Sequence, residues 1–207
     1  MKRLSILLAA AVVILTGCAV GNTHSYDQAV PAVNATSGIN LGLGVQDVRV
    51  YVLDKNKPES FVGVTRGGYG NPFDVNTTNG KPLADNVAIS LKKALEAKGA
   101  KINVVALPLG MSKQDAIKTL SQKSPKSILV TISEFKSDTY INTKFDYSVR
   151  VDVYQDGQLL ATKRVEGPEN LGGNFIDPFS HAREVLPPAY KKIFRELLTS
   201  PEIAKHL

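Results

Sequence analysis

The sequence predicts a single α+β domain built from one mixed β-sheet, with helices packed largely on one face. Several short segments alternate apolar and polar residues, as half-buried strands do, while only a few repeat apolar residues at a helical spacing. The predicted order is β-β-α-β-α-β-β-β-α, and a closing strand meander with few helices is typical of α+β proteins. Because no internal repeat is present, residues 45–207 are expected to form one domain.

Two short strands and a glycine-rich loop are predicted first. Valines alternate with other residues at the start of the domain, which favours a strand from residue 45 that includes Val48, Val50 and Val52. A polar turn separates it from a second strand over residues 61–64. Residues 66–72 contain three glycines and end in Pro72, so they are expected to form a loop.

The middle of the chain predicts two helices and a strand. Pro82 is expected to open the first helix, whose apolar residues recur every four positions until Gly99 ends it. Residues 102–107 predict a strand. Ser112, with Asp115 three positions later, is typical of the capped start of a short helix.

A three-strand meander and a last helix are predicted after residue 126. The strands are expected at 127–135, 145–153 and 159–165, with Asp156-Gly157 as a tight hairpin turn. Residues 166–174 are expected to be a loop. Asp177 and Pro178 then predict the start of a helix, and Pro187-Pro188 predicts a kink in it or two abutting helices.

The composition excludes several classes of protein. The 207 residues are 43% hydrophobic and 21% charged, which excludes a collagen-like or fully disordered chain. The net charge is +6, and it falls to +4 when Lys2 and Arg3 are removed with a leader, so no nucleic-acid partner is expected. One cysteine and three histidines predict no disulfide, no metal site and no cofactor.

Residues 1–17 have the pattern of a lipoprotein signal peptide. Two basic residues precede an apolar stretch over residues 4–15, which is shorter than the roughly 20 residues that a membrane-spanning helix needs. Leu15-Thr16-Gly17-Cys18 follows, and it resembles the bacterial lipobox, with cleavage expected between Gly17 and Cys18. The alternatives are an ordinary cleaved signal with Cys18 there by chance, or a retained anchor helix.

Cys18 is the chain's only cysteine and the predicted site of lipidation. Its thiolate is a nucleophile that can take a diacylglyceryl group, and two or three acyl chains, such as palmitate, anchor a protein stably. Ala19 rather than Asp follows it, which resembles the sorting pattern for the outer membrane of diderm bacteria. Residues 18–44 carry a single charge, at Asp27, and are expected to be a flexible tether, although 29–33 could instead pack as an added strand.

The loop over residues 66–72 is the one candidate contact site. No helix follows its glycines directly, so it lacks the helix N-terminus that a phosphate cradle needs. Arg66, Tyr69 and Phe73 are predicted to contact an envelope protein or a cell-wall glycan. The alternatives are a structural hairpin tip, or Phe73 packed beneath the loop as a lid on the core.

No arrangement of residues predicts catalysis. Ser180 and His181 are adjacent on a helix and point in different directions, so they are expected to be a solvated helix start. Asp146 and Asp152 alternate with apolar residues and are expected on the outer face of their strand. The sequence therefore predicts a protein that is not an enzyme.

The pattern of elements resembles that of small envelope lipoproteins of the YajG type. Asp47-Val48-Arg49 matches an early Asp-x-Arg element, and a helix ending in Gly99, the meander over 145–165 and a C-terminal helix take the expected places within residues 45–198. The resemblance implies no enzyme activity. We therefore expect a lipid-anchored, periplasm-facing lipoprotein with a non-enzymatic binding or accessory role in an envelope complex. The alternative is a small hydrolase or ligand-binding enzyme that acts on envelope glycans.

Overall fold

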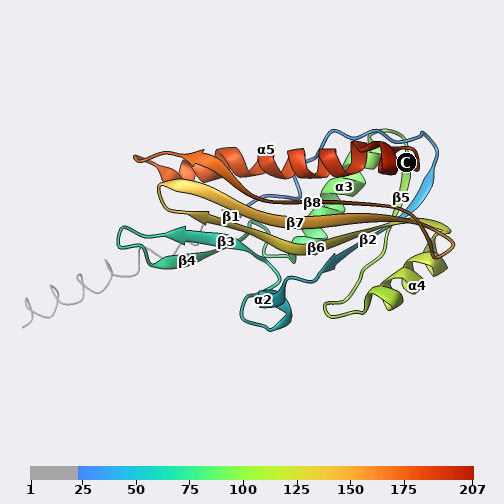
Figure 1. Ribbon diagram of the computed structural model, residues 1–207, viewed down its shortest axis with the longest axis horizontal. Helices are drawn as coiled ribbons and strands as arrows, with labels where there is room; N and C mark the ends of the chain where they lie inside the picture. Colours follow the sequence, from blue (N-terminus) through green and yellow to red (C-terminus); the bar gives the residue numbers. More distant parts are fainter. Residues whose placement is uncertain (1–22) are drawn as a thin grey trace, which may run out of the picture.

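The computed structural model describes residues 23–207, which form one α+β domain with a curled, mixed β-sheet (Figure 1). The predicted fold class is confirmed. The strands are β1 (Thr23–His24), β2 (Asn40–Asp47), β3 (Phe61–Arg66), β4 (Pro72–Thr77), β5 (Lys101–Val104), β6 (Lys126–Thr139), β7 (Asn142–Gln155) and β8 (Gln158–Gly173). The helices are α2 (Val50–Leu53), α3 (Leu83–Glu96), α4 (Lys113–Lys123), α5 (Pro178–Thr199) and α6 (Pro201–Ala204).

Strand β6 is the centre of the sheet. Its first half pairs in parallel with β2 and its second half pairs in parallel with β3, while β7 runs antiparallel along its whole length. Beyond these, β5 lies next to β2, β4 and then β1 lie next to β3, and β8 lies next to β7. The sequence did not predict β1 or β4.

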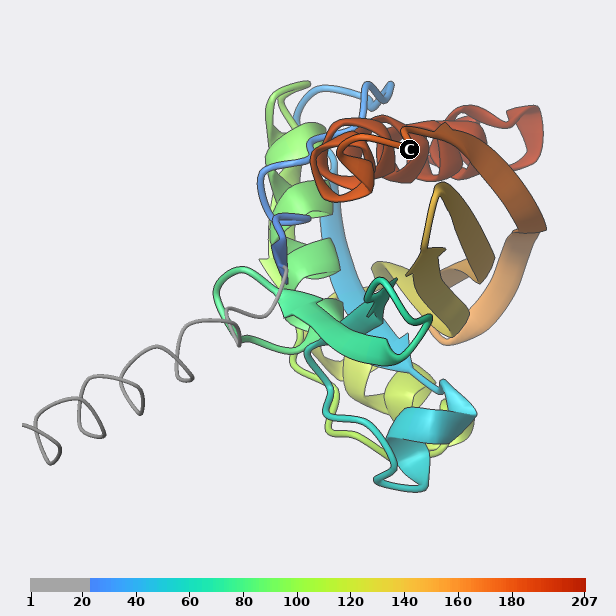
Figure 2. The same ribbon diagram turned by 90° about the vertical axis from the view of Figure 1, so that its left-hand side faces the viewer.

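The helices cover mainly one face of the sheet. Helices α3 and α5 share the main core with the inward side chains of β2, β6 and β7. Helix α4 packs on the other face, against Leu129 of β6 and Tyr154 of β7. Figure 2 shows α5 lying across the open side of the curled sheet beside α3, with α4 on the opposite side. Within residues 23–207, no helix is both long and apolar enough to cross a membrane.

The described part of the predicted tether, residues 23–44, is folded onto the domain. Tyr26, Ala29 and Val33 are buried in the main core, and β1 pairs with β4. The glycines of β2 mark close packing, because a Cβ on Gly44 would lie 2.7 Å from Leu107 Cδ1. This stretch has few charges and many small residues because it packs tightly against the domain. The prediction of a flexible tether is therefore wrong for residues 23–44.

Several strand boundaries also differ from the prediction, and the two largest differences lie at β2 and β8. The strand predicted through Val52 ends at Asp47, and the chain leaves the sheet in the short helix α2. The loop predicted over 166–174 is wrong as far as Gly173, because β8 continues to that residue. Pro168 is tolerated in β8 because β8 is an edge strand that pairs only with β7, so one side needs no N–H donor.

Local signals for turns and caps were more reliable. Asp156 and Gly157 both have positive φ, at 51° and 79°, as the predicted hairpin turn requires. The Ser112 side chain caps α4 by accepting from Asp115 N, and Asp177 caps α5 by accepting from Ser180 N. Helix α5 is continuous through Pro187 and Pro188, so the prediction of two abutting helices is wrong.

Candidate functional site

Three chain reversals lie together at one end of the domain, at the left of Figure 1 and facing the viewer in Figure 2. They are the β3–β4 turn over 67–71, the β6–β7 turn over 140–141 and the β8–α5 connection over 174–177. The pairing explains this gathering, because Thr65 of β3 lies beside Thr139 of β6, and Asn142 of β7 lies beside Gly173 of β8. We call this the loop end.

The loop end carries six of the twelve exposed large apolar side chains of the described residues. Tyr69 is fully exposed, and Phe175 and Ile176 are 82% and 93% exposed. The other three are about half exposed: Phe73, Tyr140 and Ile141. Turns ordinarily carry small polar residues, so this concentration of apolar side chains makes the loop end the candidate interaction surface of the described residues.

Arg66 fixes the β3–β4 turn to the neighbouring strand. Its Nε and Nη2 donate to the two carboxylate oxygens of Asp138 at 2.7 and 2.6 Å, and its Nη1 donates to Gly70 O at 3.3 Å. These bonds to Asp138 raise the pKa of Arg66. Arg66 was predicted as a contact residue, and the structure places it in an ion pair that positions the turn.

The two predicted aromatic residues of this turn both face solvent. Phe73 is outside the buried core clusters, and its ring lies against its own hairpin, with Cε2 3.0 Å from a Cβ built on Gly67. The alternative of Phe73 as a lid on the core is therefore wrong. Whether Tyr69 and Phe73 contact a partner remains a prediction.

The other two turns are bonded to their neighbours at the loop end. Tyr140 Oη donates to Gly68 O at 3.3 Å, and Asn174 N donates to Ile141 O at 3.1 Å. Asn174 Oδ1 also accepts from the backbone of Ile176 at 2.8 Å, which holds the exposed pair Phe175-Ile176 in place. The sequence reasoning missed these two turns, although an apolar pair between predicted elements was the signal that could have found them.

The loop end includes an open depression of about 390 Å³. It is lined by Arg66, Asp138, Tyr140, Ile141, Asn142 and Lys144. Since Arg66 and Asp138 neutralise each other, Lys144 is the unmatched charge of this lining. The depression offers polar groups behind the apolar tips and brings no pair of carboxylates together.

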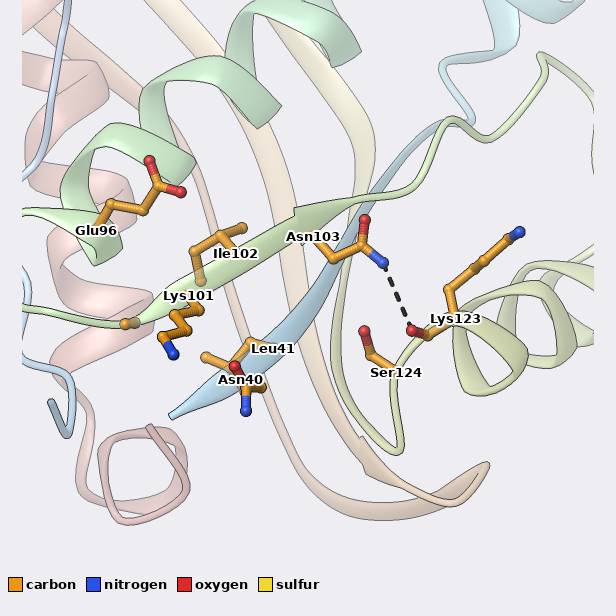
Figure 3. Close-up of a pocket in the computed structure, with 9 residues that line it drawn as sticks. Asn40, Leu41, Glu96, Lys101, Ile102, Asn103, Lys123 and Ser124 are labelled. Atoms are coloured by element: carbon orange, nitrogen blue, oxygen red, sulfur yellow. Dashed lines mark hydrogen bonds between the residues drawn. The ribbon is translucent and has the colours of Figure 1, made fainter. Parts of the chain in front are cut away.

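A second depression, of about 540 Å³, lies beside the edge strand β5, away from the loop end (Figure 3). Figure 3 shows Glu96 of α3 on one side of β5 and Lys123 and Ser124, at the end of α4, on the other. The one hydrogen bond drawn joins Asn103 Nδ2 to Lys123 O, at 3.5 Å. Glu96 is the only acid in its lining, so this depression also lacks paired carboxylates.

Asp152 was predicted on an outer, solvated face, and this is wrong. Helix α4 covers that face, and Asp152 is 1% exposed. Its carboxylate is matched by Lys113 Nζ at 2.9 Å and Arg150 Nε at 3.2 Å, and it accepts from Thr162 Oγ1 at 2.6 Å. Asp146, predicted on the same outer face, is half-buried.

The remaining candidate for chemistry, His181, bonds to the backbone. Its Nε2 lies 3.2 Å from Leu171 O, and the side chain is half-buried instead of solvated. Among residues 23–207, no group of three or more His, Cys, Asp and Glu residues could hold a metal ion.

The Asp47-Val48-Arg49 element holds three parts of the fold together. Arg49 is fully buried, and it donates to both carboxylate oxygens of Asp47, at 2.8 and 2.5 Å. It also donates to Phe61 O at 2.6 Å and Phe135 O at 3.3 Å, which join α2 to β3 and β6. Burial alone would lower the pKa of Arg49, but Asp47 reverses this effect and the pKa is raised. The element is architectural.

No protein-family model matches the sequence, and none of the curated proteins is similar to it. Solved structures with a similar arrangement include a DUF330 protein from Xanthomonas campestris. It is 14% identical, over 82% of this chain and 90% of its own, with a TM-score of 0.46.

Two other similar structures have lower identities. A neuraminyllactose-binding hemagglutinin homologue from Helicobacter pylori is 9% identical over 86% of this chain and 91% of its own, with a TM-score of 0.42. A PelC dodecamer from Paraburkholderia phytofirmans is 12% identical, over 83% of this chain and 95% of its own, with a TM-score of 0.39. At this distance, none of these likenesses indicates what the chain binds.

Proposed function

We propose that this chain is a lipoprotein of the bacterial envelope that is anchored by acyl chains on Cys18 and has a non-enzymatic binding or accessory role. The observation that carries the proposal is the stretch Leu15-Thr16-Gly17-Cys18, in which the chain's only cysteine follows a short apolar leader at the position that lipidation requires. Gly17 and Cys18 lie outside the described residues, so the proposal rests on sequence chemistry at this point.

The folded domain supports a binding role through the loop end. Tyr69, Phe175 and Ile176 are exposed on turns that hydrogen bonds and the Arg66–Asp138 ion pair hold in place. An exposed apolar surface on fixed turns costs solubility in a free domain, and a bound partner would offset that cost. We propose the loop end as the contact surface and, from Ala19, the periplasmic side of an outer membrane as the location.

The alternative, a hydrolase or ligand-binding enzyme for envelope glycans, has less support. Glycoside hydrolysis ordinarily uses two carboxyl groups that flank one bond. The two depressions described above contain one acid each, Asp138 and Glu96, and Asp138 is paired with Arg66. A third depression, between β8 and α5, is lined by Glu169 and Glu184, but Glu169 is paired with Lys192.

Metabolic labelling with palmitate tests the anchor directly. Wild-type protein is expected to incorporate label and stay with the membrane fraction, because Cys18 supplies the only thiolate for acylation. Cys18→Ser is expected to lose the label and to accumulate unprocessed or leave the membrane. Val20→Ser, two residues beyond the cleavage position, is the matched control and should label like the wild type. Equal labelling of the wild type and Cys18→Ser would end the lipoprotein proposal.

A further inference from the structure

We propose that the loop end binds the lipid bilayer itself, with the apolar turns placed in the interface of the membrane to which Cys18 attaches the chain. This inference rests on the proposed lipidation and names the partner of the contact surface. The lipid bilayer is chosen over a protein partner because of where the chain enters the domain, how few residues separate Cys18 from it, and which side chains the turns carry.

The first described residue, Thr23, lies on β1, and the N-terminal end of this strand points toward the loop end. Strand β1 is parallel to β4, with Thr23 beside Asn76 and His24 beside Thr77. Strand β4 begins at Pro72, directly after the turn over 67–71. Since parallel strands share one direction, the N-terminal end of β1 faces the loop end. From Asn76 back to Pro72 is four residues, or about 13 Å at strand spacing.

The covalent distance from Cys18 to Thr23 is short. Five residues can span at most about 17–18 Å when fully extended, so acyl chains on Cys18 hold Thr23 within that distance of the membrane. This length is enough for Cys18 to reach the level of the turns from Thr23, about 13 Å away, and it leaves little to spare. The opposite end of the sheet is far out of reach, because β7 has 14 residues and is about 40 Å long.

The side chains of the three turns suit a bilayer interface. Residues 67–71 and 140–141 contain no Lys, Arg, Asp or Glu, and residues 174–177 contain one, Asp177, whose carboxylate caps α5. Tyr69 and Tyr140 combine an aromatic ring with a hydroxyl, which is the combination enriched where membrane meets water. The other large apolar side chains exposed at the loop end are those of Ile141, Phe175 and Ile176 in the turns and Phe73 at the start of β4. The exposed polar side chains of the turns include the uncharged amides of Asn71 and Asn174.

The anchor and the turns therefore act on the same end of the molecule. Acyl chains supply the affinity for the membrane, and contact by three turns fixes the orientation of the domain. In this orientation the long axis of the sheet stands away from the membrane, and the β7–β8 turn and the depression beside β5 face the aqueous phase.

Tryptophan fluorescence tests this orientation, because the chain contains no tryptophan. Single variants Tyr69→Trp and Phe175→Trp report on the loop end, and Leu159→Trp is the matched control at the opposite end, where Leu159 is 53% exposed. Each full-length protein is purified from membranes and its acylation is verified by intact mass. Each is then reconstituted in phosphatidylethanolamine and phosphatidylglycerol vesicles that contain brominated acyl chains.

The two loop-end tryptophans are expected to emit at shorter wavelength and to be quenched at least twofold by the brominated lipid, while Leu159→Trp stays at its level in unbrominated vesicles. Equal, weak quenching of all three in acylated protein would overturn the inference and leave the anchor intact. The same holds if photo-crosslinking from position 69 in cells captures one protein and no lipid. A mass without acyl groups would overturn the proposed anchor, and the inference with it.

Discussion

His24 is a buried histidine at the start of the described chain, and burial governs its charge. It is 5% exposed, next to the ring of Tyr26, and its backbone carbonyl accepts from Thr78 N at 3.0 Å. Burial, with a smaller contribution from the positive charge of Arg183, lowers its pKa from 6.5 to about 4. The folded state therefore prefers the neutral ring, whereas the unfolded chain takes up a proton near pH 6.5.

This difference predicts acid destabilisation. The contribution of His24 is fully present above pH 6.5 and is lost as the pH falls toward 4, because protonation then favours the unfolded chain. A shift of this size corresponds to about 3 kcal/mol of unfolding free energy between pH 7 and pH 4. Urea unfolding of the wild type and of His24→Gln at pH 7 and pH 4 checks this prediction. The difference in unfolding free energy between the two proteins should change by about 3 kcal/mol between these pH values. Parallel profiles would show that His24 is not responsible.

Strand β7 presents two faces that are both buried, and this changes what its substitutions should do. Val151 faces the main core and is fully buried, and Asp152 faces α4, where Lys113, Arg150 and Thr162 hold its carboxylate. A buried carboxylate with such partners contributes to stability, whereas a new one among apolar side chains opposes folding.

Thermal melts of three variants test these assignments. Val151→Asp should remove several kcal/mol, a large part of the roughly 5–15 kcal/mol that stabilises an ordinary domain. Asp152→Ala should cost about 1–3 kcal/mol, because Thr162 and Tyr154 lose their acceptor. Asp146→Ala, at a half-buried position of the same strand, should change the melting temperature little. If Asp152→Ala has the same melting temperature as Asp146→Ala, the ion pairs of Asp152 contribute nothing to stability.

Elements with local signals were predictable, and elements set by distant pairing were not. Ser112 and Asp115 mark α4 because a cap is a contact between near neighbours, and Asp156-Gly157 marks its turn because of positive φ. Strand β2 was hidden because Gly42 and Gly44 resemble a flexible segment, whereas they pack against Ser124 and Leu107 from elsewhere in the chain.

The same distinction limits what the sequence says of the candidate site. The glycine-rich turn with Tyr69 and Phe73 was predictable from its composition. That two further turns lie beside it was not, because this depends on the parallel pairing of β3 with β6 and on the full length of β8. Arg66 was predicted to face a partner, and its pairing with Asp138 required the neighbouring strand to be known.

For the whole molecule, the proposed anchor and the fold are consistent with one arrangement. The first described residue, Thr23, is five residues after Cys18, and it lies on a strand whose N-terminal end faces the loop end. A domain this close to the proposed anchor would stay at the membrane surface, whereas a long tether would let it reach partners farther away. The lipidated cysteine is therefore the central claim, because both the location and the orientation of the domain depend on it.

The most direct measurement is mass spectrometry of the N-terminal peptide from protein isolated from bacterial membranes. We predict that the mature chain begins at Cys18 and that this residue carries two or three acyl chains, through its thiol and, where a third is present, its amino group. A mature chain that begins at any other residue, or a Cys18 with no acyl group, would contradict it.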